Sequence, residues 1–191
     1  LLEIAKLDQG AMTPENRHFC INDILKPLTS EYAILCQEKG LKLKIRPSNT
    51  IVQCDTTYLR RILQNLVSNA VKYTDTGKVL VGCRYIATKD SQPKHIRIEI
   101  WDTGPGISQY QQDKIFSDFY RIDSSDNKGV GLGLGVVKRM ADLLALKLEV
   151  KSIEGKGSCF SIEVPLGQSQ LVQQKAINNI QFDSKKSFNV I

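Results

Sequence analysis

Two glycine-rich segments carry the residue types that could hold a ligand against the backbone. DTGPG spans residues 102–106 after an apolar alternating run, and GVGLGLG spans residues 129–135. Glycines let a backbone approach a ligand closely, and the carboxylate of Asp102 offers an acceptor that suits an amino group. Apolar residues follow the second segment at helical spacing, so its free N–H groups and the positive end of a helix dipole favour phosphate. The two segments together predict a nucleotide site, with the base at the first and the phosphates at the second.

A helix upstream offers polar side chains to the same site. LRRILQNLVSNAVKYT, residues 59–74, has an apolar face and is preceded by Asp55, which can cap a helix. Asn65 and Asn69 lie four residues apart and Lys72 three further on, so they share one side of that helix. Two side-chain carbonyls can hold a hydrated magnesium ion while the lysine meets phosphate. The residues leave two plainer interpretations open: a solvated polar stripe on the helix, and an ordinary turn at DTGPG.

Strands and further helices must position these segments. Alternating apolar residues predict strands at 41–46, 78–87 and 95–102, and the last two form an antiparallel hairpin that delivers Asp102. The remaining expected elements are a helix over 1–9, a short strand from Arg17, a helix over 22–38, a strand over 50–54, a short helix through Phe116, and a final hairpin over 146–166 that turns at 154–157.

Local signals define where two of these helices begin and end. Asn22 can cap the helix over 22–38, and Gly40 ends it. Ser108 and Gln111 make a capping box for the helix that runs through Phe116. The residues expected to point inward from the first of these helices are Ile24, Leu25, Leu28, Tyr32 and Leu35.

Five motifs follow one another in a fixed order: NLVSNAVKYT, DTGPGI, IFSDFYR, GVGLGLG and GKGSCFSIEVPL. They resemble the N box, first glycine box, F box, second glycine box and closing hairpin of sensor histidine kinases, within the wider superfamily of gyrase, heat-shock chaperone and mismatch-repair ATPases. The resemblance covers about residues 1–167 and looks closest to cytosolic hybrid kinases, in which a receiver domain follows the kinase core. It implies an α/β sandwich: a mixed, largely antiparallel sheet covered on one face by three helices, with a mobile ATP lid.

The resemblance also implies roles for single residues. Asp102 would accept a hydrogen bond from the exocyclic amine of adenine, while Gly104 and Gly106 shape the turn. Asn65 and Asn69 would bring magnesium to the triphosphate. The other ATP-binding positions implied are Lys72, Tyr73, Ile107, Gly129, Gly131, Leu132, Gly133 and Ser158, with Ser158 near the base.

A lid over about residues 121–130 would close over ATP, and Arg121 and Lys128 are its cationic candidates for the γ-phosphate. Together with Asn65 they form the catalytic set that the resemblance implies. A lid of this composition would bury too little apolar surface to stay ordered without nucleotide.

The chain departs from the family pattern in three places. Arg61 stands four residues before Asn65, where many relatives carry a carboxylate or glutamine that can orient a water. ATP hydrolysis is therefore disfavoured, whereas phosphoryl transfer depends more on positioning and charge stabilisation. Val130 and Gly135 replace the threonine and serine common in the second glycine box, so phosphate binding relies more on the backbone.

The resemblance divides the chain into three parts. Residues 1–10 are the end of a dimerisation and phosphotransfer helix, and residues 11–167 are the catalytic ATP-binding domain. Residues 168–191 are a linker that can lead to a truncated receiver domain. The implied reaction moves the γ-phosphoryl group of Mg-ATP to a histidine on a helical hairpin outside these residues, because neither His18 nor His95 has an acceptor context. The implied partners are that hairpin and a response-regulator receiver domain, with a homodimer for the full-length protein and a monomer for this piece.

Two other functions remain open at this point. One is a non-catalytic nucleotide-sensing or scaffold module that kept the fold and lost transfer. The other is an ATP-driven clamp of the gyrase or mismatch-repair type, which predicts strong hydrolysis and dependence on nucleic acid. Arg61 disfavours strong hydrolysis, and the scattered basic residues disfavour dependence on nucleic acid.

Composition limits the remaining classes. The 191 residues, 41% of them hydrophobic and 24% charged, can form one good core. The sequence has no run of 18 apolar residues and no signal-peptide pattern, so a cytoplasmic piece without a membrane segment is expected. The five cysteines form no CxxC pair, which favours reduced thiols over a disulfide frame or a zinc site. The net charge of +6 is spread along the chain, so no nucleic-acid partner is expected.

Overall fold

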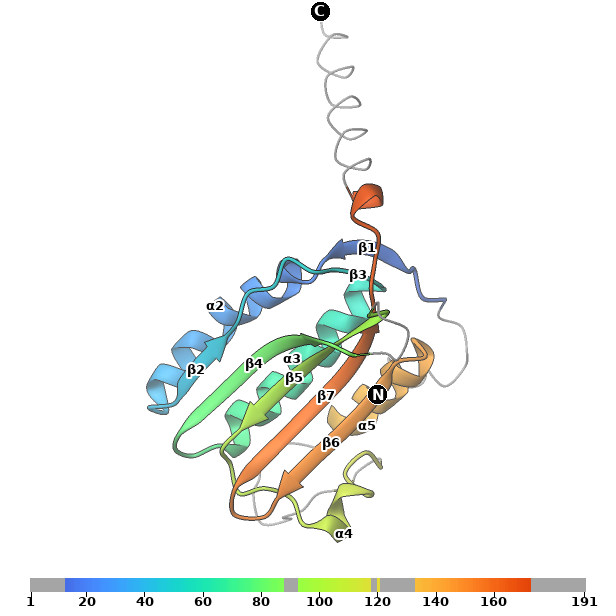
Figure 1. Ribbon diagram of the computed structural model, residues 1–191. Helices are drawn as coiled ribbons and strands as arrows, with labels where there is room; N and C mark the ends of the chain where they lie inside the picture. Colours follow the sequence, from blue (N-terminus) through green and yellow to red (C-terminus); the bar gives the residue numbers. More distant parts are fainter. Residues whose placement is uncertain (1–12, 88–92, 118–119, 121–132, 173–191) are drawn as a thin grey trace, which may run out of the picture.

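Helices cover one face of a five-stranded sheet in the computed structural model (Figure 1). The structure describes residues 13–87, 93–117, 120 and 133–172. The edge strand β2 pairs with β4 in parallel, and the other neighbouring strands pair antiparallel. This confirms the mixed, largely antiparallel sheet predicted from the sequence. In spatial order the strands are β2 (Lys42–Ile45), β4 (Lys78–Tyr85), β5 (His95–Asp102), β7 (Gly157–Pro165) and β6 (Lys147–Ile153).

Three helices form the second layer, as predicted. They are α2 (Asn22–Glu38), α3 (Thr56–Tyr73) and α5 (Gly133–Leu143), and all lie behind the sheet in the view of Figure 1. A fourth and much shorter helix, α4 (Gln109–Gln112), lies beyond the end of the sheet. Two short strands, β1 (Arg17–Cys20) and β3 (Ile51–Cys54), make a separate antiparallel pair.

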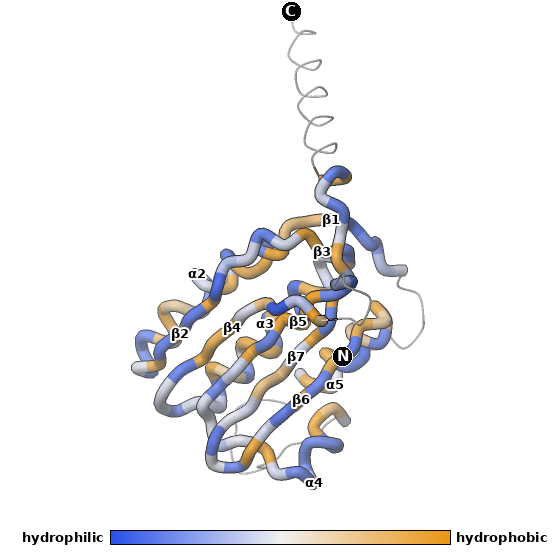
Figure 2. The backbone as a smooth tube through the Cα atoms, in the orientation of Figure 1, coloured by the Kyte–Doolittle hydropathy of each residue, from blue (hydrophilic) through white to orange (hydrophobic). Residues whose placement is uncertain are grey.

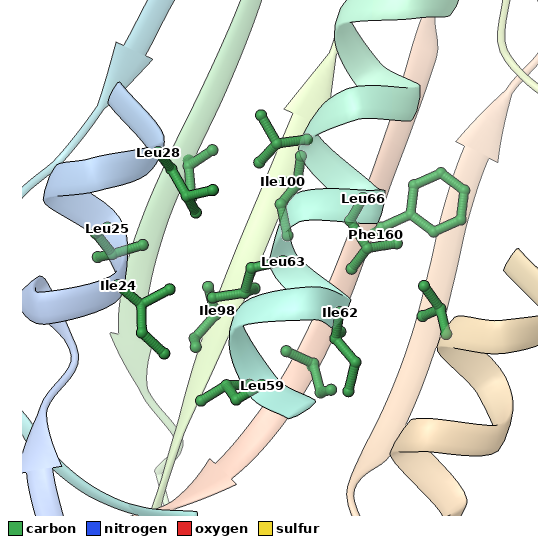
Figure 3. Packing of buried hydrophobic residues seen from close by; sticks show 14 of the residues in the cluster. Ile24, Leu25, Leu28, Leu59, Ile62, Leu63, Leu66, Ile98, Ile100 and Phe160 are labelled. Carbon is green, nitrogen blue, oxygen red and sulfur yellow. The ribbon is translucent and has the colours of Figure 1, made fainter. Parts of the chain in front are cut away.

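The core lies between the inner face of the sheet and the apolar faces of the helices. Successive strand residues alternate between hydrophobic and hydrophilic (Figure 2), so every second side chain points toward the helices. Ile98 and Ile100 of β5 meet Leu63 and Leu66 of α3 there (Figure 3), and all four are fully buried. Burying one side chain of this size contributes about 1.5–3 kcal/mol to folding. This packing fixes the position of α3 over the central strand.

The start of α3 matches its prediction. The Oδ1 atom of Asp55 accepts hydrogen bonds from the backbone N–H groups of Thr57 at 2.9 Å and Tyr58 at 3.1 Å. Its second oxygen accepts one from the N–H of Glu15 at 2.8 Å. The cap therefore stabilises α3 and also holds the segment that leads into β1.

The start of α2 differs from its prediction. The capping position is taken by Ile21, which is helical and fully buried, so Asn22 becomes the first helical residue and caps nothing. Leu35, which was predicted to point inward, is 44% exposed, and Cys36 is buried instead. The reason is that Cys36 lies four residues after the buried Tyr32 and so shares its face of α2. The predicted end is confirmed, since Gly40 has the positive φ of +67° typical of a residue that terminates a helix.

Both predicted hairpins are present, while one helix is shorter than expected. The pairings of β4 with β5 and of β6 with β7 confirm the hairpins. The helix expected through Phe116 ends at Gln112 and continues as turns. Phe116 still packs edge-on against Phe160, with ring centroids 6.4 Å apart, so it anchors the turns after α4. Phe119, the helix expected over 1–9, the lid and residues 173–191 lie outside the described residues.

Candidate nucleotide-binding site

The inner face of the sheet changes from apolar to polar at one end. Ile100 of β5 pairs with Phe160 of β7, and both belong to the core. Two residues further along these strands, on the same face, come Asp102 and Ser158, and Ser158 pairs with Ser152 of β6. Three neighbouring strands thus end in a row of polar side chains directly beside the core.

Asp102 is held in place and keeps one oxygen for a ligand. Its Oδ1 accepts from the backbone N–H of Gly104 at 2.9 Å and of Ser158 at 3.3 Å, and within the described residues Oδ2 has no hydrogen bond. Burial raises the pKa of this carboxyl above its ordinary value, although the same two backbone hydrogen bonds act in the opposite direction. The result is a fixed acceptor that suits an amino group.

The turn after Asp102 packs so closely against its surroundings that only glycine fits. A Cβ on Gly106, whose φ is +72°, would lie 2.1 Å from the carbonyl oxygen of Ile153. A Cβ on Gly104 would lie 2.9 Å from the carbonyl oxygen of Tyr73. The turn is therefore enclosed between the hairpin of β6 and β7 and the end of α3.

The end of α3 is secured by a lysine from another helix. The Nζ of Lys39, directly after α2, donates to the carbonyl oxygens of Val71 at 2.7 Å, Lys72 at 3.0 Å and Thr74 at 2.8 Å. These are the carbonyls that a helix end leaves without partners. The Gly104 turn, where the nucleotide base is predicted to bind, lies against this end of α3. Lys39 therefore supports this part of the site, called the base end below, without belonging to it. No local pattern signals this contact, which spans more than thirty positions of the chain.

The predicted phosphate end lies between α3 and the start of α5. A Cβ on Gly133 would lie at ordinary van der Waals distance from both amides, 3.4 Å from Oδ1 of Asn65 and 3.9 Å from Nδ2 of Asn69, so both amides lie against the start of α5. The Nδ2 of Asn65 donates to the carbonyl of Arg61 at 2.9 Å, which turns its Oδ1 toward α5. A carbonyl oxygen is a ligand that magnesium accepts, with water and phosphate completing its shell.

Lys72 and Tyr73 border the site at the end of α3. The Nζ of Lys72 donates to the hydroxyl of Tyr73 at 3.0 Å and lies 4.6 Å from the centre of its ring. Tyr73 is 52% exposed. The pair thus presents a cation and a ring at the open side of the helix.

Two residues near the base end were missed by the sequence analysis. The hydroxyl of Ser152 accepts from the N–H of Ile107 at 2.8 Å and lies 2.9 Å from that of Ser158. The side chain of Gln112 donates to the carbonyl of Ile107 at 2.9 Å and to that of Ser152 at 3.1 Å. Only the position of Ser152 just before a tight hairpin could have drawn attention to it.

The structure brings together the described part of the predicted site. Two hollows among the described residues lie away from these groups, one between α4 and β6 and one at the start of α3. The predicted residues that lie outside the described part are Arg121, Lys128, Gly129, Gly131 and Leu132.

The described residues also bear on the expectations about cysteines, metal-binding clusters and membrane-spanning helices. The five cysteines are free thiols, and burial raises the pKa of Cys54 to about 12 and that of Cys83 to about 11. No group of three His, Cys, Asp or Glu side chains suited to a metal occurs in the described part. Among its helices, none is long and apolar enough to cross a membrane.

The chain belongs to the family of histidine kinase-, DNA gyrase B- and HSP90-like ATPases, whose model matches residues 54–168. Among curated proteins it is similar to the autoinducer 2 sensor kinase/phosphatase LuxQ of Vibrio vulnificus, 32% identical over 185 residues and 94% of this chain. It is also similar to the aerobic respiration control sensor protein ArcB of Escherichia coli, 34% identical over 171 residues and 86% of the chain. The matches span only 22% and 21% of those relatives. The resemblance to sensor histidine kinases is thereby confirmed.

Solved structures show the same fold. Full-length ShkA in complex with AMPPNP aligns with a TM-score of 0.76 and 29% identity, covering 88% of this chain and 35% of that one. The catalytic domain of the histidine kinase ThkA aligns with a TM-score of 0.66 and 24% identity, covering 79% of this chain and 95% of that one, and shows the shared fold. The fold is therefore that of a histidine kinase catalytic domain.

Proposed function

We propose that this chain binds Mg-ATP as the catalytic domain of a two-component sensor histidine kinase. In this role it transfers the γ-phosphoryl group to a histidine on a helical hairpin of the same protein. The observation that carries the proposal is a set of polar groups beside α3 with two ends: a fixed carboxylate at the end of β5, and two asparagine amides facing Gly133 at the start of α5. Membership of the ATPase family and the AMPPNP bound to ShkA support it.

The residues divide the work along the nucleotide. Oδ2 of Asp102 accepts from the adenine amine, and the Gly104 turn lets the ring approach the backbone. Lys72 and Tyr73 border the sugar and phosphates at the end of α3. Glycines at the start of α5 offer N–H groups to the phosphates. This holds the nucleotide in one orientation, which is the main requirement of phosphoryl transfer.

Magnesium fits the phosphate end of this arrangement. Asn65 and Asn69 supply neutral oxygen ligands from successive turns of α3, which suits an ion that keeps several waters and binds phosphate. When bound, the ion would neutralise charge on the triphosphate. Arg121 and Lys128 are the proposed cations for the γ-phosphate from the lid side.

The remaining proposals concern the whole protein. We assign residues 1–10 to the end of a dimerisation and phosphotransfer helix, 11–167 to the catalytic domain and 168–191 to a linker toward a receiver domain. Dimerisation and a response-regulator partner would belong to the full-length protein. ATP as donor and five free thiols support a cytoplasmic location for this domain.

Binding is tested first by titration calorimetry with Mg-ATP and Mg-GTP. We expect ATP to bind about ten- to hundredfold more tightly, because guanine places a carbonyl opposite the carboxylate. Equal affinities would contradict the role of Asp102.

Transfer is tested with radioactive ATP. His18 lies on β1 and His95 on β5, so neither is on a helix, and we expect the chain alone to stay unlabelled. A separately supplied hairpin from the full-length protein should acquire acid-labile phosphate. Label on the chain alone would mean that one of its histidines is an acceptor or that the domain boundaries are wrong. ATP binding without label on the hairpin would favour the non-catalytic sensing module.

A further inference from the structure

Ser152 links the two strands and the turn that form the base end of the site. Its Oγ accepts from the N–H of Ile107 at 2.8 Å, donates to the carbonyl oxygen of Gly157 at 2.9 Å, and lies 2.9 Å from Oγ of Ser158. Ser152 and Ser158 are also direct partners across β6 and β7. One hydroxyl group therefore connects the segment after Asp102 to the strand that carries Ser158.

The number of protons determines the direction of the bond between the two serines. A serine hydroxyl has one proton, and that of Ser152 goes to Gly157. Ser158 must then donate to Ser152, which leaves only lone pairs on the Ser158 oxygen for a ligand. Asp102, whose Oδ1 is bound by the N–H of Ser158 at 3.3 Å, contributes a second acceptor through Oδ2. Two neighbouring acceptors favour a ligand that presents donor hydrogens.

Gln112 holds this arrangement from the other side. This residue is 9% exposed, and its Nε2 donates to the carbonyl oxygens of Ile107 at 2.9 Å and Ser152 at 3.1 Å. Both protons of the amide are thereby used. Ile107 is held at its N–H by Ser152 and at its carbonyl by Gln112, so the segment after Asp102 has one position.

We propose that Ser152, oriented with the help of Gln112, is a positioning residue that makes the base end of the site accept hydrogen bonds without donating them. It thereby sets the preference for a purine with an exocyclic amine over one with a carbonyl at the same position. This inference rests on the proposed function, because it requires a purine nucleotide as ligand. Without the Ser152 hydroxyl, the proton of Ser158 is free to turn toward the ligand and can meet the carbonyl of guanine.

The test is the ratio of ATP to GTP affinity in Ser152→Ala, measured by calorimetry. We expect ATP to bind about five- to tenfold more weakly and GTP to change by less than about twofold, so the preference falls. Ser152→Thr keeps the hydroxyl and should restore the preference. Ser161 is another buried serine, three positions after Ser158 on β7. Ser161→Ala is therefore the matched control and should leave the ratio unchanged. A structural defect alone would weaken both nucleotides equally.

The outcomes separate this inference from the proposed function. A wild-type chain that binds neither nucleotide would overturn the proposed function. A wild-type chain that prefers ATP, together with an unchanged ratio in Ser152→Ala, would overturn only the role of Ser152. If Ser152→Ala does not fold, Gln112→Leu provides the second test: its ATP-to-GTP preference should fall a few-fold, and an unchanged preference would also overturn the proposal.

Discussion

The proposed base end and the proposed phosphate end of the nucleotide site are built in different ways. At the base end, Asp102 terminates a central strand, and hydrogen bonds from β6, β7 and α4 fix its surroundings. At the phosphate end, Asn65 and Asn69 project from α3 toward a glycine at the start of α5. The first end consists mainly of backbone turns, and the second of side chains on one helix.

This difference indicates which end of the site can discriminate between nucleotides. A preorganised acceptor keeps its geometry when a ligand arrives, so a wrong base leaves a buried polar group unpaired. Half-exposed amides on a helix can adapt, and in the proposed function they act through a metal ion and its waters. We therefore expect the base end to select the nucleotide and the phosphate end to hold it.

The largest effect should come from Asp102→Asn. The amide can keep the two hydrogen bonds at Oδ1, but it places a donor where Oδ2 faces the adenine amine. We expect ATP affinity to fall about ten- to hundredfold while GTP gains relative to ATP. Calorimetry measures both, and Asp75→Asn, an exposed residue before β4, is the control. An unchanged ATP affinity would mean that the base lies elsewhere.

Asn69→Ala should have the next largest effect. Truncation leaves the apolar face of α3 intact, so the empty protein should melt as before, whereas magnesium-dependent ATP affinity should fall about tenfold. Thermal melting with and without Mg-ATP distinguishes the two. Arg60→Ala, an exposed residue on the same helix, serves as control. A full ligand-induced rise in melting temperature would contradict the metal role.

Lys39→Met tests whether the base end depends on the end of α3. The change removes three hydrogen bonds from a charged donor, so unfolding free energy should fall by about 1–3 kcal/mol. ATP affinity should fall only a few-fold, because Lys39 acts through the Gly104 turn. Denaturant unfolding and calorimetry measure the two effects. Lys26→Met, exposed on α2, should change neither, and normal stability in Lys39→Met would contradict the supporting role.

The smallest effect concerns pH. Burial raises the pKa of Asp102 above 3.8, so the folded protein binds this proton more tightly than the unfolded chain does. The stability from this group is fully present below its unfolded pKa and is lost as pH rises through the folded value. ATP needs the ionised form, so its affinity should fall as pH falls through the raised pKa. Calorimetry across acidic pH should show this fall in the wild type and not in Asp102→Asn.

The sequence determined the features that depend on local patterns. The apolar face of α3, its Asp55 cap, the alternation of β4 and β5, and the close-packed glycines after Asp102 follow from helical and strand periods and from backbone freedom. The resemblance assigned the ATP-binding positions along these elements. Local signals failed where tertiary packing competed with them: burial of Ile21 moved the start of α2, and turns replaced the helix expected through Phe116.

Only the tertiary structure decided the contacts that support the site. Lys39 reaches α3 across more than thirty positions, and Ser152 reaches Ile107 across 45. Gln112 and Ser152 looked like ordinary polar residues in the sequence, because a single hydrogen bond leaves no periodic pattern. Their roles depend on the register of β6 with β7 and on the packing of α2 against α3, which bring together donors and acceptors that the chain keeps far apart.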